Sequence, residues 1–304
     1  MNKDAQNLEP TYAFSNGEGL LELCKIHQCN ISEIMIRREM YLSECSREAV
    51  LAEMKLNLDV MREGVTMGLD EPQSSVSGFT VGDAIKLKRF RKRSYLGENV
   101  CDMVAAALSV VEVNSAMGKI VSAPTAGASG VIPGCLITAA GQYNISDEKL
   151  IEALFCTAAV GMIIAENATI SGAEGGCQAE VGSASAMTAA ALCEMRSALP
   201  KTCLNAAAIA LKNILGLVCD PVAGLVECPC IKRNAMGSVN AVVAADMSLA
   251  GINSLIPFDE VVSAMKSVGR LMHVDLKETA KGGLAATKTG KELLRKIREA
   301  LPES

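Results

Sequence analysis

The feature of this sequence that most limits its fold is a long region, from about Val100 onward, whose helical segments lack a polar face. Segments 150–165, 183–195 and 234–250 consist largely of Ala, Val, Met, Ser and Gly. A helix that is apolar on nearly every side is stable only when it is buried among other elements. The small side chains also allow close approach of the backbones. We therefore expect tightly packed central helices.

More polar helices are predicted around this centre. Segments 31–42 and 47–67 are charged and amphipathic, and Ser46 is placed to cap the second of them. Segment 291–300 is similar, and Pro257 is expected in the first turn of a further helix, where its missing NH costs nothing. Strand signals are almost absent. The prediction is an all-α fold, with buried Ala/Gly-rich central helices, amphipathic helices wrapped around them, and glycine-rich loops that carry the site.

Length and charge exclude several classes of protein. The chain has 304 residues, 50% of them hydrophobic, so it can bury a large core. We expect one catalytic domain over 1–304, with a charged helical part at 1–95 and a core that binds cofactor and substrate at 96–304. A net charge of -5 offers no basic surface for nucleic acid. The N-terminus lacks a signal pattern and the apolar stretch 154–165 is too short to span a bilayer, so we expect a cytoplasmic protein.

The chain has twelve cysteines. Because it is large, has no signal pattern and is rich in methionine, these cysteines are predicted to be reduced thiols. A single free cysteine is most often a small buried hydrophobe. We assign that role to the eight cysteines in apolar helical patterns, which are Cys24, Cys29, Cys45, Cys101, Cys135, Cys156, Cys193 and Cys203.

Three glycine-rich loops interrupt the helical pattern. They are 122–134, 171–183 and 216–230, and each leads into a helical segment. Glycine-rich backbone at the start of a helix exposes NH groups at the positive end of the helix dipole, which suits an anion. Glycines that only make turns are an equally good explanation. In the first loop, however, Thr125 and Ser129 add hydroxyls that could hold the polar groups of a substrate.

The second and third loops contain the remaining cysteines. Cys177 lies in the second loop, and Cys219, Cys228 and Cys230 lie in the third. The sequence has no C-x-x-C pair, which argues against a zinc ribbon, a ferredoxin-type site and a redox dithiol. Three thiolates could hold an iron–sulfur cubane and leave one iron with an exchangeable site, as a catalytic Lewis acid requires. Buried hydrophobes and metal ligands both remain open on spacing alone.

Four blocks of the sequence closely resemble one known family. They are NSAMGKIVSAPTAGASGVIPG, NATISGAEGGCQAEVGSASAM, GLVCDPVAGLVECPCIKRNAMGSVNAVVAADMSLAG and GGLAATKTGKEL. In order and spacing they are similar to the alpha chain of the iron–sulfur-dependent bacterial L-serine dehydratases, also called L-serine ammonia-lyases, over nearly the whole chain. The resemblance implies an all-helical catalytic domain. It also implies a 4Fe–4S cluster whose protein ligands match Cys177, Cys219 and Cys230.

The reaction that the resemblance implies is dehydration of L-serine to aminoacrylate, which becomes pyruvate and ammonia. Because hydroxide leaves poorly and the α-proton is weakly acidic, elimination needs an acid at the oxygen and a base at the carbon. By analogy with other hydro-lyases of this cluster type, the open iron would bind the substrate hydroxyl. We hypothesise that the first loop binds the substrate carboxylate through Thr125, Gly127, Ala128, Ser129 and Gly130.

The sequence does not identify the general base. His27 and His273 are better explained by structural roles than by catalysis. Members of the family carry a Ser-His-Thr-x-Gly-Pro motif in a beta domain or chain, and this sequence has no such stretch. We therefore expect a beta subunit that completes the pocket, and an oligomeric assembly. Arg233 could orient substrate or cluster or lie at the surface, and Asn234 could do the same or cap a helix.

The chain departs from the family pattern at three places. Cys228 stands where an aliphatic residue is usual, as a small hydrophobe or as a spare thiol near the cluster. SGFTVGDA (77–84) replaces a glycine with Val81, which cannot adopt a positive φ, so this loop is either ordinary or reshaped. The ending LRKIREALPES lacks the cysteine that caps the open iron in single-chain members. That difference predicts an open iron and a cluster that decays quickly in air.

Three other functions compete with this interpretation. A pyridoxal-phosphate dehydratase needs an α/β sheet and a lysine motif such as Ser-x-Lys, and neither is found. A cysteine desulfidase on a related cluster fold is possible, because sulfide and hydroxide leave by similar routes. A non-catalytic helical scaffold that binds zinc or nothing would use its thiols only as buried hydrophobes. The preference among serine, threonine and cysteine stays open.

Overall fold

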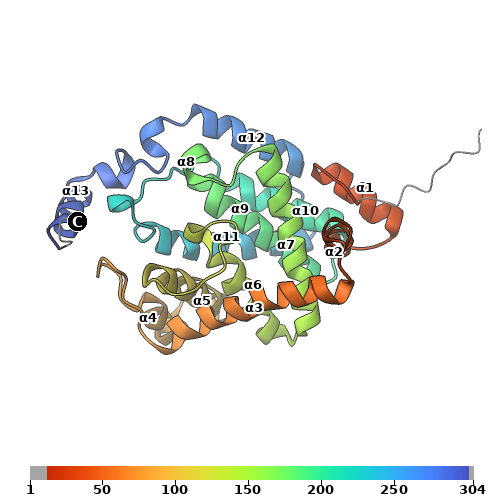
Figure 1. Ribbon diagram of the computed structural model, residues 1–304, viewed down its shortest axis with the longest axis horizontal. Helices are drawn as coiled ribbons and strands as arrows, with labels where there is room; N and C mark the ends of the chain where they lie inside the picture. Colours follow the sequence, from red (N-terminus) through yellow and green to blue (C-terminus); the bar gives the residue numbers. More distant parts are fainter. Residues whose placement is uncertain (1–11, 301–304) are drawn as a thin grey trace, which may run out of the picture.

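The computed structural model describes residues 12–300, and these form a fold built from helices (Figure 1). Within that range the only β-type pairings are two isolated bridges, Ser74 with Val81 and Cys219 with Lys277. The all-α prediction is therefore confirmed. The expectations about an N-terminal signal and about the last four residues rest on positions outside the described range.

The bounds of the helices follow the hydrophobic pattern of the sequence closely. The α-helices are α1 (Gly17–His27), α2 (Ile31–Ser43), α3 (Arg47–Asp70), α4 (Asp83–Phe90), α5 (Gly97–Ser115), α6 (Val131–Tyr143), α7 (Asp147–Asn167), α8 (Gly172–Gly175), α9 (Ser183–Met195), α10 (Pro200–Lys212), α11 (Cys230–Leu249), α12 (Phe258–Leu271) and α13 (Lys288–Ala300). Short 3-10 turns are η1 (Arg91–Arg93), η2 (Ala126–Ala128), η4 (Val222–Gly224), η5 (Val274–Leu276) and η6 (Gly283–Ala286), and η3 (Gln178–Gly182) is a π-helical turn.

Helix α9 lies at the centre of the fold, packed against α6, α7, α10 and α11. Nearly all of its residues are buried, as its lack of a polar face predicts. Glycines make the closest helix approaches possible. A Cβ atom added to Gly134 of α6 would lie 2.5 Å from the backbone nitrogen of Ala107 on α5. The backbones of α5 and α6 therefore meet where only a glycine fits.

The amphipathic N-terminal helices cover this centre from one side. Helix α2 packs on α7 and α3 packs on α5. Ser46 caps α3 by accepting from the NH of Ala49 at 3.3 Å, as predicted. Arg62 of α3 donates to Asp147 at the start of α7 with Nη1 2.8 Å from Oδ2. These contacts join the charged N-terminal helices to the buried ones.

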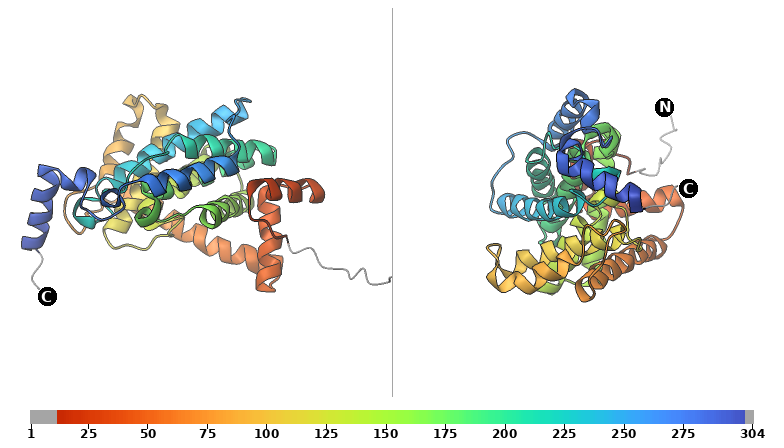
Figure 2. Two further views of the ribbon diagram at one scale, coloured as in Figure 1. Left: turned by 90° about the horizontal axis from the view of Figure 1, so that it is seen from above. Right: turned by 90° about the vertical axis from the view of Figure 1, so that its left-hand side faces the viewer.

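Two expectations about the C-terminal half are wrong. Helix α13 does not wrap the central helices: it lies at the edge of the molecule, far from α1, with its main contacts to η4 and η6 (Figure 2). Its sequence is amphipathic, but the surface that it covers belongs to loops. Pro257 is the N-cap of α12 and lies outside its first turn, with extended backbone at φ -61° and ψ 156°. The residue before the helix must be extended, and proline readily adopts that conformation.

Helix α7 is longer than the apolar stretch that the sequence analysis considered. In the described residues it is the one helix long and apolar enough to cross a membrane, but 67% of that window is buried inside the protein. The surrounding helices thus cover most of it. This burial is typical of a core helix and explains its apolar composition without a membrane.

All twelve cysteines lie in the described range and are unpaired thiols. Of the eight that we expected to be small buried hydrophobes, six are buried and Cys29 is partly buried. Cys45 is exposed, so the prediction for this residue is wrong. It lies in the turn between α2 and α3. The apolar pattern of the sequence includes Cys45, but the chain leaves the buried face of the helices at this turn.

Candidate active site

The three glycine-rich loops predicted from the sequence come together at one place, ahead of α6, α9 and α11. Asn234 of α11 joins the first loop to this place: its Nδ2 donates to the carbonyl of Gly127 at 2.7 Å, and its Oδ1 accepts from the NH of Gly130 at 3.0 Å. The side chain is fully buried within α11. Asn234 is therefore not an N-cap, because it lies a full turn inside its helix, where it ties the first loop to α11.

Gln178 joins the second loop to the third. Its side chain is fully buried. Its Oε1 accepts from the NH of Gly216 at 2.9 Å, and its Nε2 donates to the carbonyl of Met265 on α12 at 3.0 Å. The backbone NH of Gln178 also donates to Leu217 at 3.0 Å. One glutamine thus satisfies buried polar groups of both loops, a role that its sequence context did not reveal.

The cysteines predicted as cluster ligands are all buried. Cys177 directly precedes η3, Cys219 lies in extended backbone, and Cys230 is the first residue of α11. Burial raises the pKa of Cys177 to about 11 and that of Cys230 to about 12. Burial is also the largest cause that raises the pKa of Cys219, and the negative charges of Glu180 and of Cys177 raise it further. Each thiol is therefore close enough to influence at least one of the others.

The arrangement of these thiols bears on what they could hold. Over residues 12–300, no three His, Cys, Asp or Glu side chains converge closely enough to hold a single metal ion. A single zinc ion needs its thiolates at about 2.3 Å from one point, whereas each thiolate of a cubane binds a different iron. Three buried thiols, one from the second loop and two from the third, that do not meet at one point fit the larger group better than a single ion. Cys228 is partly buried, and its carbonyl accepts from the NH of Val222 at 2.8 Å within the third loop.

Arg233 supplies the positive charge of the site. From α11 its Nη1 donates to the carbonyl of Val218 and its Nη2 to Oδ1 of Asp220, both at 2.8 Å. The guanidinium also acts on the Cys177 thiol, where it opposes the rise in pKa that burial causes. The reading of Arg233 as a surface residue is therefore wrong. The signal in the sequence was its position one turn after Cys230, on the same face of a helix.

Segment 276–278 holds Cys219 in place, and the motif GGLAATKTG (282–290) that follows it packs against Asp220 of the third loop. The NH of Cys219 donates to the carbonyl of Leu276, and the NH of Glu278 donates to the carbonyl of Cys219, both at 2.8 Å. Oδ2 of Asp220 accepts from the NH of Leu284 at 2.8 Å. A Cβ added to Gly283 would clash with Asp220, so this residue must be glycine, which its φ of +56° also favours.

Glu180 is a buried carboxylate at the centre of the site, and sequence analysis missed it. Its Oε1 accepts from the Thr125 hydroxyl at 2.7 Å, and its Oε2 lies 3.7 Å from the Cys219 sulfur. Burial raises the pKa of this carboxyl group. The available signal was an acidic residue within a loop of small residues, three positions after Cys177.

The five predicted substrate-binding residues divide into two groups. Thr125 and Gly127 lie beside the Glu180 carboxylate. The other three are buried, and their NH groups donate inside the protein: Ala128 to Thr125, Ser129 to Ala126 and Gly130 to Asn234. The Ser129 hydroxyl donates to the carbonyl of Ala126 at 2.8 Å.

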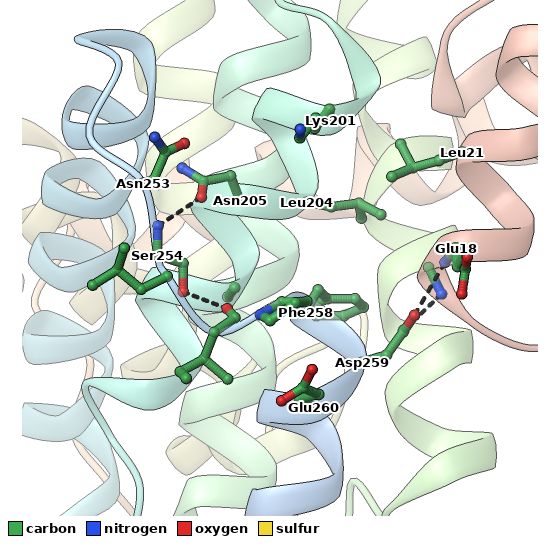
Figure 3. A pocket seen from close by; sticks show the side chains of 15 residues that line it. Glu18, Leu21, Lys201, Leu204, Asn205, Asn253, Ser254, Phe258, Asp259 and Glu260 are labelled. Carbon is green, nitrogen blue, oxygen red and sulfur yellow. Dashed lines mark hydrogen bonds between the residues drawn. The ribbon is translucent and has the colours of Figure 1, made fainter.

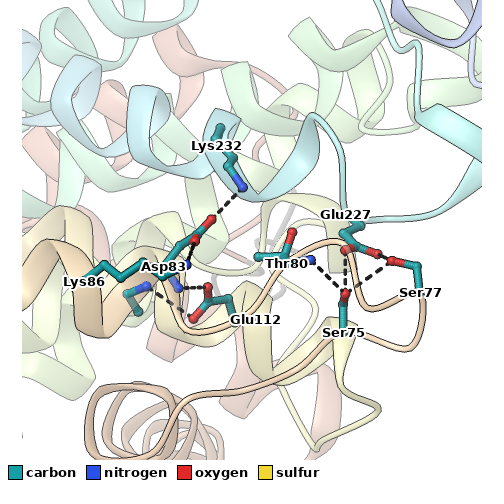
Figure 4. A network of polar contacts seen from close by, with 9 residues as sticks. Ser75, Ser77, Thr80, Asp83, Lys86, Glu112, Glu227 and Lys232 are labelled. Carbon is teal, nitrogen blue, oxygen red and sulfur yellow. Dashed lines mark hydrogen bonds and ion pairs between the residues drawn. The ribbon is translucent and has the colours of Figure 1, made fainter. Parts of the chain in front are cut away.

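The loop 74–82, which contains Val81, is fastened to the third glycine-rich loop (Figure 4). Ser75 and Ser77 donate to the two carboxylate oxygens of Glu227, which is 4% exposed. Val81 has an ordinary backbone conformation and bridges to Ser74, while Gly78 has a positive φ of 73°. The loop therefore does not require a positive φ at Val81, which a valine could not readily adopt.

Next to that loop, carboxylates bind the start of α4. Glu112 of α5 accepts from the NH of Asp83 at 2.5 Å, and Asp83 pairs with Lys232 of α11 at 2.6 Å (Figure 4). The two histidines take no part in these networks in the described contacts. The His27 ring packs on Tyr12 with 5.0 Å between centroids, and the exposed His273 accepts from the NH of Asp275.

A separate cavity of about 570 Å³ lies between α1, α10 and the start of α12 (Figure 3). Asp259 accepts from the NH of Gly17 at 2.7 Å on one side of it, and Ser254 donates its NH to Asn205 at 2.8 Å on the other. None of the residues that line this cavity belongs to the site formed by the three loops.

Comparison with known proteins places these features in a family. The model of the serine dehydratase alpha chain family matches residues 26–285. A probable L-serine dehydratase alpha chain of Bacillus subtilis (strain 168) is 51% identical over 286 residues, which cover 93% of this chain and 95% of that protein. An L-serine dehydratase alpha chain of Peptoniphilus asaccharolyticus is 42% identical over 280 residues, with 91% and 95% covered.

A longer relative matches over a part of its length. An L-serine dehydratase of Helicobacter pylori (strain J99) is 35% identical over 294 residues, which cover 94% of this chain but 64% of that protein. This chain therefore corresponds to a whole alpha chain in some relatives and to a portion of a longer chain in others.

Proposed function

The chain belongs to the serine dehydratase alpha chain family, and on this premise we propose that it is the alpha subunit of a two-chain, iron–sulfur-dependent L-serine dehydratase of the cytoplasm. The enzyme would convert L-serine to pyruvate and ammonia, a step of amino-acid breakdown. The lengths of the relatives support the two-chain organisation, because this chain matches nearly all of the proteins that are named alpha chains. The proposed partner is a separate beta subunit.

The proposed cofactor is a 4Fe–4S cluster held by Cys177, Cys219 and Cys230. The single observation that carries the proposal is that these three thiols, one from the second loop and two from the third, are buried near one another, since the charges of neighbouring thiols raise the pKa of Cys219 and of Cys230. Arg233 lies beside them and offsets the negative charge of a thiolate set. When bound, the cluster would supply an iron with an exchangeable site that polarises the hydroxyl group of the substrate.

The proposed substrate site is the first glycine-rich loop, through Thr125, Gly127, Ala128, Ser129 and Gly130. The loop leads into the N-terminus of α6, where the helix dipole favours the substrate carboxylate. Thr125 and Gly127 support direct contact most strongly, because they are partly exposed while the other three residues are buried. The other three residues fix the loop through their internal hydrogen bonds.

We propose that the beta subunit supplies the acid–base groups that this chain does not provide. His27 packs on Tyr12 and His273 accepts from the NH of Asp275, and both contacts are structural. The buried loops would exclude water from the pocket, because the fully buried side chains of Gln178 and Asn234 hold these loops in place.

The test is the content of iron and acid-labile sulfide per chain after strictly anaerobic purification. We expect near-equal amounts, about three to four of each, and loss of both when Cys177, Cys219 or Cys230 is replaced by serine. Cys228→Ser is the matched control, because it changes a thiol of the same loop outside the proposed ligand set. The loaded chain with its beta subunit should then form pyruvate from L-serine faster than sulfide from L-cysteine. Zinc, or no metal after anaerobic reconstitution, would refute the proposal.

A further inference from the structure

We propose that Glu180 binds the α-ammonium group of the amino-acid substrate. The inference rests on the proposed function and extends it, because it names the group that distinguishes an amino acid from a simple hydroxy acid. A zwitterion needs an anionic partner for its ammonium group when it is removed from water, since an unpaired charge in a buried site is costly. The structure offers one carboxylate suited to that role.

The position of Glu180 is the first part of the argument. It lies on η3 between the first loop, which it meets through Thr125, and the third loop, which it meets through Cys219. A substrate whose carboxylate lies along the first loop and whose hydroxyl faces the thiols would therefore pass its α-carbon by this side chain. A single small molecule could therefore contact the first loop, the thiols and Glu180 at the same time.

The surroundings of the Glu180 carboxylate are the second part of the argument. A Cβ added to Gly172 would lie 2.6 Å from Oε2, and one added to Gly127 would lie 3.4 Å from Oε1. The backbones of these two glycines therefore lie close to the carboxylate, and neither residue has a side chain that covers Oε1 or Oε2. Each oxygen can accept two hydrogen bonds, and within residues 12–300 the donors to them are the Thr125 hydroxyl and the Cys219 thiol. An ammonium group has three hydrogens to fill the remaining positions.

The other buried carboxylates near the site already have partners on both oxygens, and Glu278, whose charge also raises the pKa of Glu180, is exposed. Asp220 accepts from Arg233 and from the NH of Leu284. Glu227 accepts from Ser75 and Ser77, and Glu112 accepts from the NH groups of Asp83 and Ala84. That list leaves Glu180 as the buried carboxylate of the site with acceptor capacity to spare. The site's own cation, Arg233, is paired with Asp220, and its charge also lowers the pKa of Glu180 from a distance, so a direct cationic partner for Glu180 is still missing among the described residues.

The experiment compares two ligands on the loaded enzyme with its beta subunit under anaerobic conditions. L-Serine has the ammonium group, whereas 3-hydroxypropanoate has the same carboxylate and hydroxyl without it and serves as a competitive inhibitor. Glu180→Gln keeps the shape and the acceptor for Thr125 but removes the charge. We expect the KM for L-serine to rise about 10- to 100-fold, the loss of one charge-assisted hydrogen bond. The inhibition constant of 3-hydroxypropanoate should change less than about twofold.

Two further variants sharpen the test. Glu194→Gln makes the same substitution at a buried carboxyl group outside the site, and both constants should match those of the wild type. Gly127→Ala adds a methyl group near Oε1 and leaves the charge of Glu180 unchanged. It should therefore weaken the binding of L-serine more than the binding of 3-hydroxypropanoate. This variant keeps the inference testable if Glu180→Gln fails to retain iron.

Three results would overturn the inference. A fall in kcat at constant KM would assign Glu180 to proton transfer, and equal weakening of both ligands would assign it to the shape of the loop. The third result is that Gly127→Ala binds L-serine and 3-hydroxypropanoate in the wild-type ratio while Glu180→Gln loses its iron. That pair of observations would mean that Glu180 supports Cys219 and does not bind the ammonium group. If wild-type enzyme loaded with iron forms no pyruvate from L-serine, the proposed function itself fails, and the inference fails with it.

Discussion

Arg233 forms an ion pair with Asp220 in which Nη2 lies 2.8 Å from Oδ1, and the two side chains are 14% and 4% exposed. The neighbouring residue on α11, Lys232, pairs with Asp83 at 2.6 Å, but those side chains are 60% and 25% exposed. Adjacent cations of one helix thus make a buried and an exposed ion pair. Because water screens the exposed pair, the two pairs should contribute very differently to stability.

Replacement of Arg233 by lysine should therefore destabilise the chain more than replacement of Lys232 by methionine. Lysine keeps the charge but cannot make the two-pronged contact with Asp220 and Val218. We expect a loss of about 1–3 kcal/mol in the free energy of unfolding for Arg233→Lys and less than about 1 kcal/mol for Lys232→Met. Urea unfolding of the cluster-free chain measures both. Equal losses would show that the burial of the Arg233 pair is energetically unimportant.

Two glycines of α6 test the close packing of the central helices. A Cβ on Gly134 would clash with the backbone of Ala107, whereas a Cβ on Gly141 meets nothing within 4 Å. Gly134→Ala should cost about 2 kcal/mol or more, because the clash is with backbone that cannot move alone. Gly141→Ala should be neutral or stabilising by up to about 1 kcal/mol, since alanine favours the helix. Thermal unfolding of the pair gives the comparison, and similar melting temperatures would contradict it.

Glu194 predicts a dependence of stability on pH. This carboxyl group accepts from the NH of Ser32 at 3.1 Å, while its Oε2 is buried without a hydrogen-bond partner, and burial raises its pKa. The folded state therefore holds the proton more tightly than the unfolded state does. The stabilisation is complete below the unfolded pKa of about 4.3 and is lost as the pH rises through the higher folded pKa.

Glu194→Gln removes this titration while keeping the acceptor for Ser32. We expect the variant and the wild type to have similar free energies of unfolding near pH 4.5, with the variant more stable by about 1 kcal/mol at pH 8. Urea unfolding at the two pH values gives the difference, in which the shifts of other carboxyl groups cancel. A variant that is less stable at pH 8 would show that the charged form is the better partner of the α2 N-terminus.

The contact of Ser75 with Glu227 predicts that loop 74–82 depends on one hydroxyl. Ser75 donates to Oε1 of Glu227 and accepts from the NH of Thr80. Ser75→Ala should cost about 1–3 kcal/mol, because it leaves buried polar groups without this partner, and should expose the loop to limited proteolysis. Ser267→Ala is the control, since that hydroxyl donates to Ser263 on an exposed helix surface. Equal cleavage of both variants would mean that the loop is held elsewhere.

Local chemistry explains the predictions that succeeded. The bounds of α9 and the cap at Ser46 depend on residues within a few positions of one another, so the sequence pattern contains them. The glycine-rich loops were found for the same reason. The errors at Cys45 and Pro257 lie at the ends of elements, where the hydrophobic pattern does not mark the residue at which the chain turns. The error at α13 concerns the surface that the helix packs against, which an amphipathic pattern does not identify.

The sequence by itself determined that this chain is helical, that its central helices are buried, and which thiols and loops are candidates for the site. Only the tertiary structure decided that Glu180 stands between Thr125 and Cys219, and that Gln178 and Asn234 hold the loops together. Thr125 and Glu180 are 55 positions apart, and Gly127 and Asn234 are 107 apart. Such pairs leave no periodic pattern, because hydrophobic periodicity records which face of a helix is buried but not which distant residue it meets.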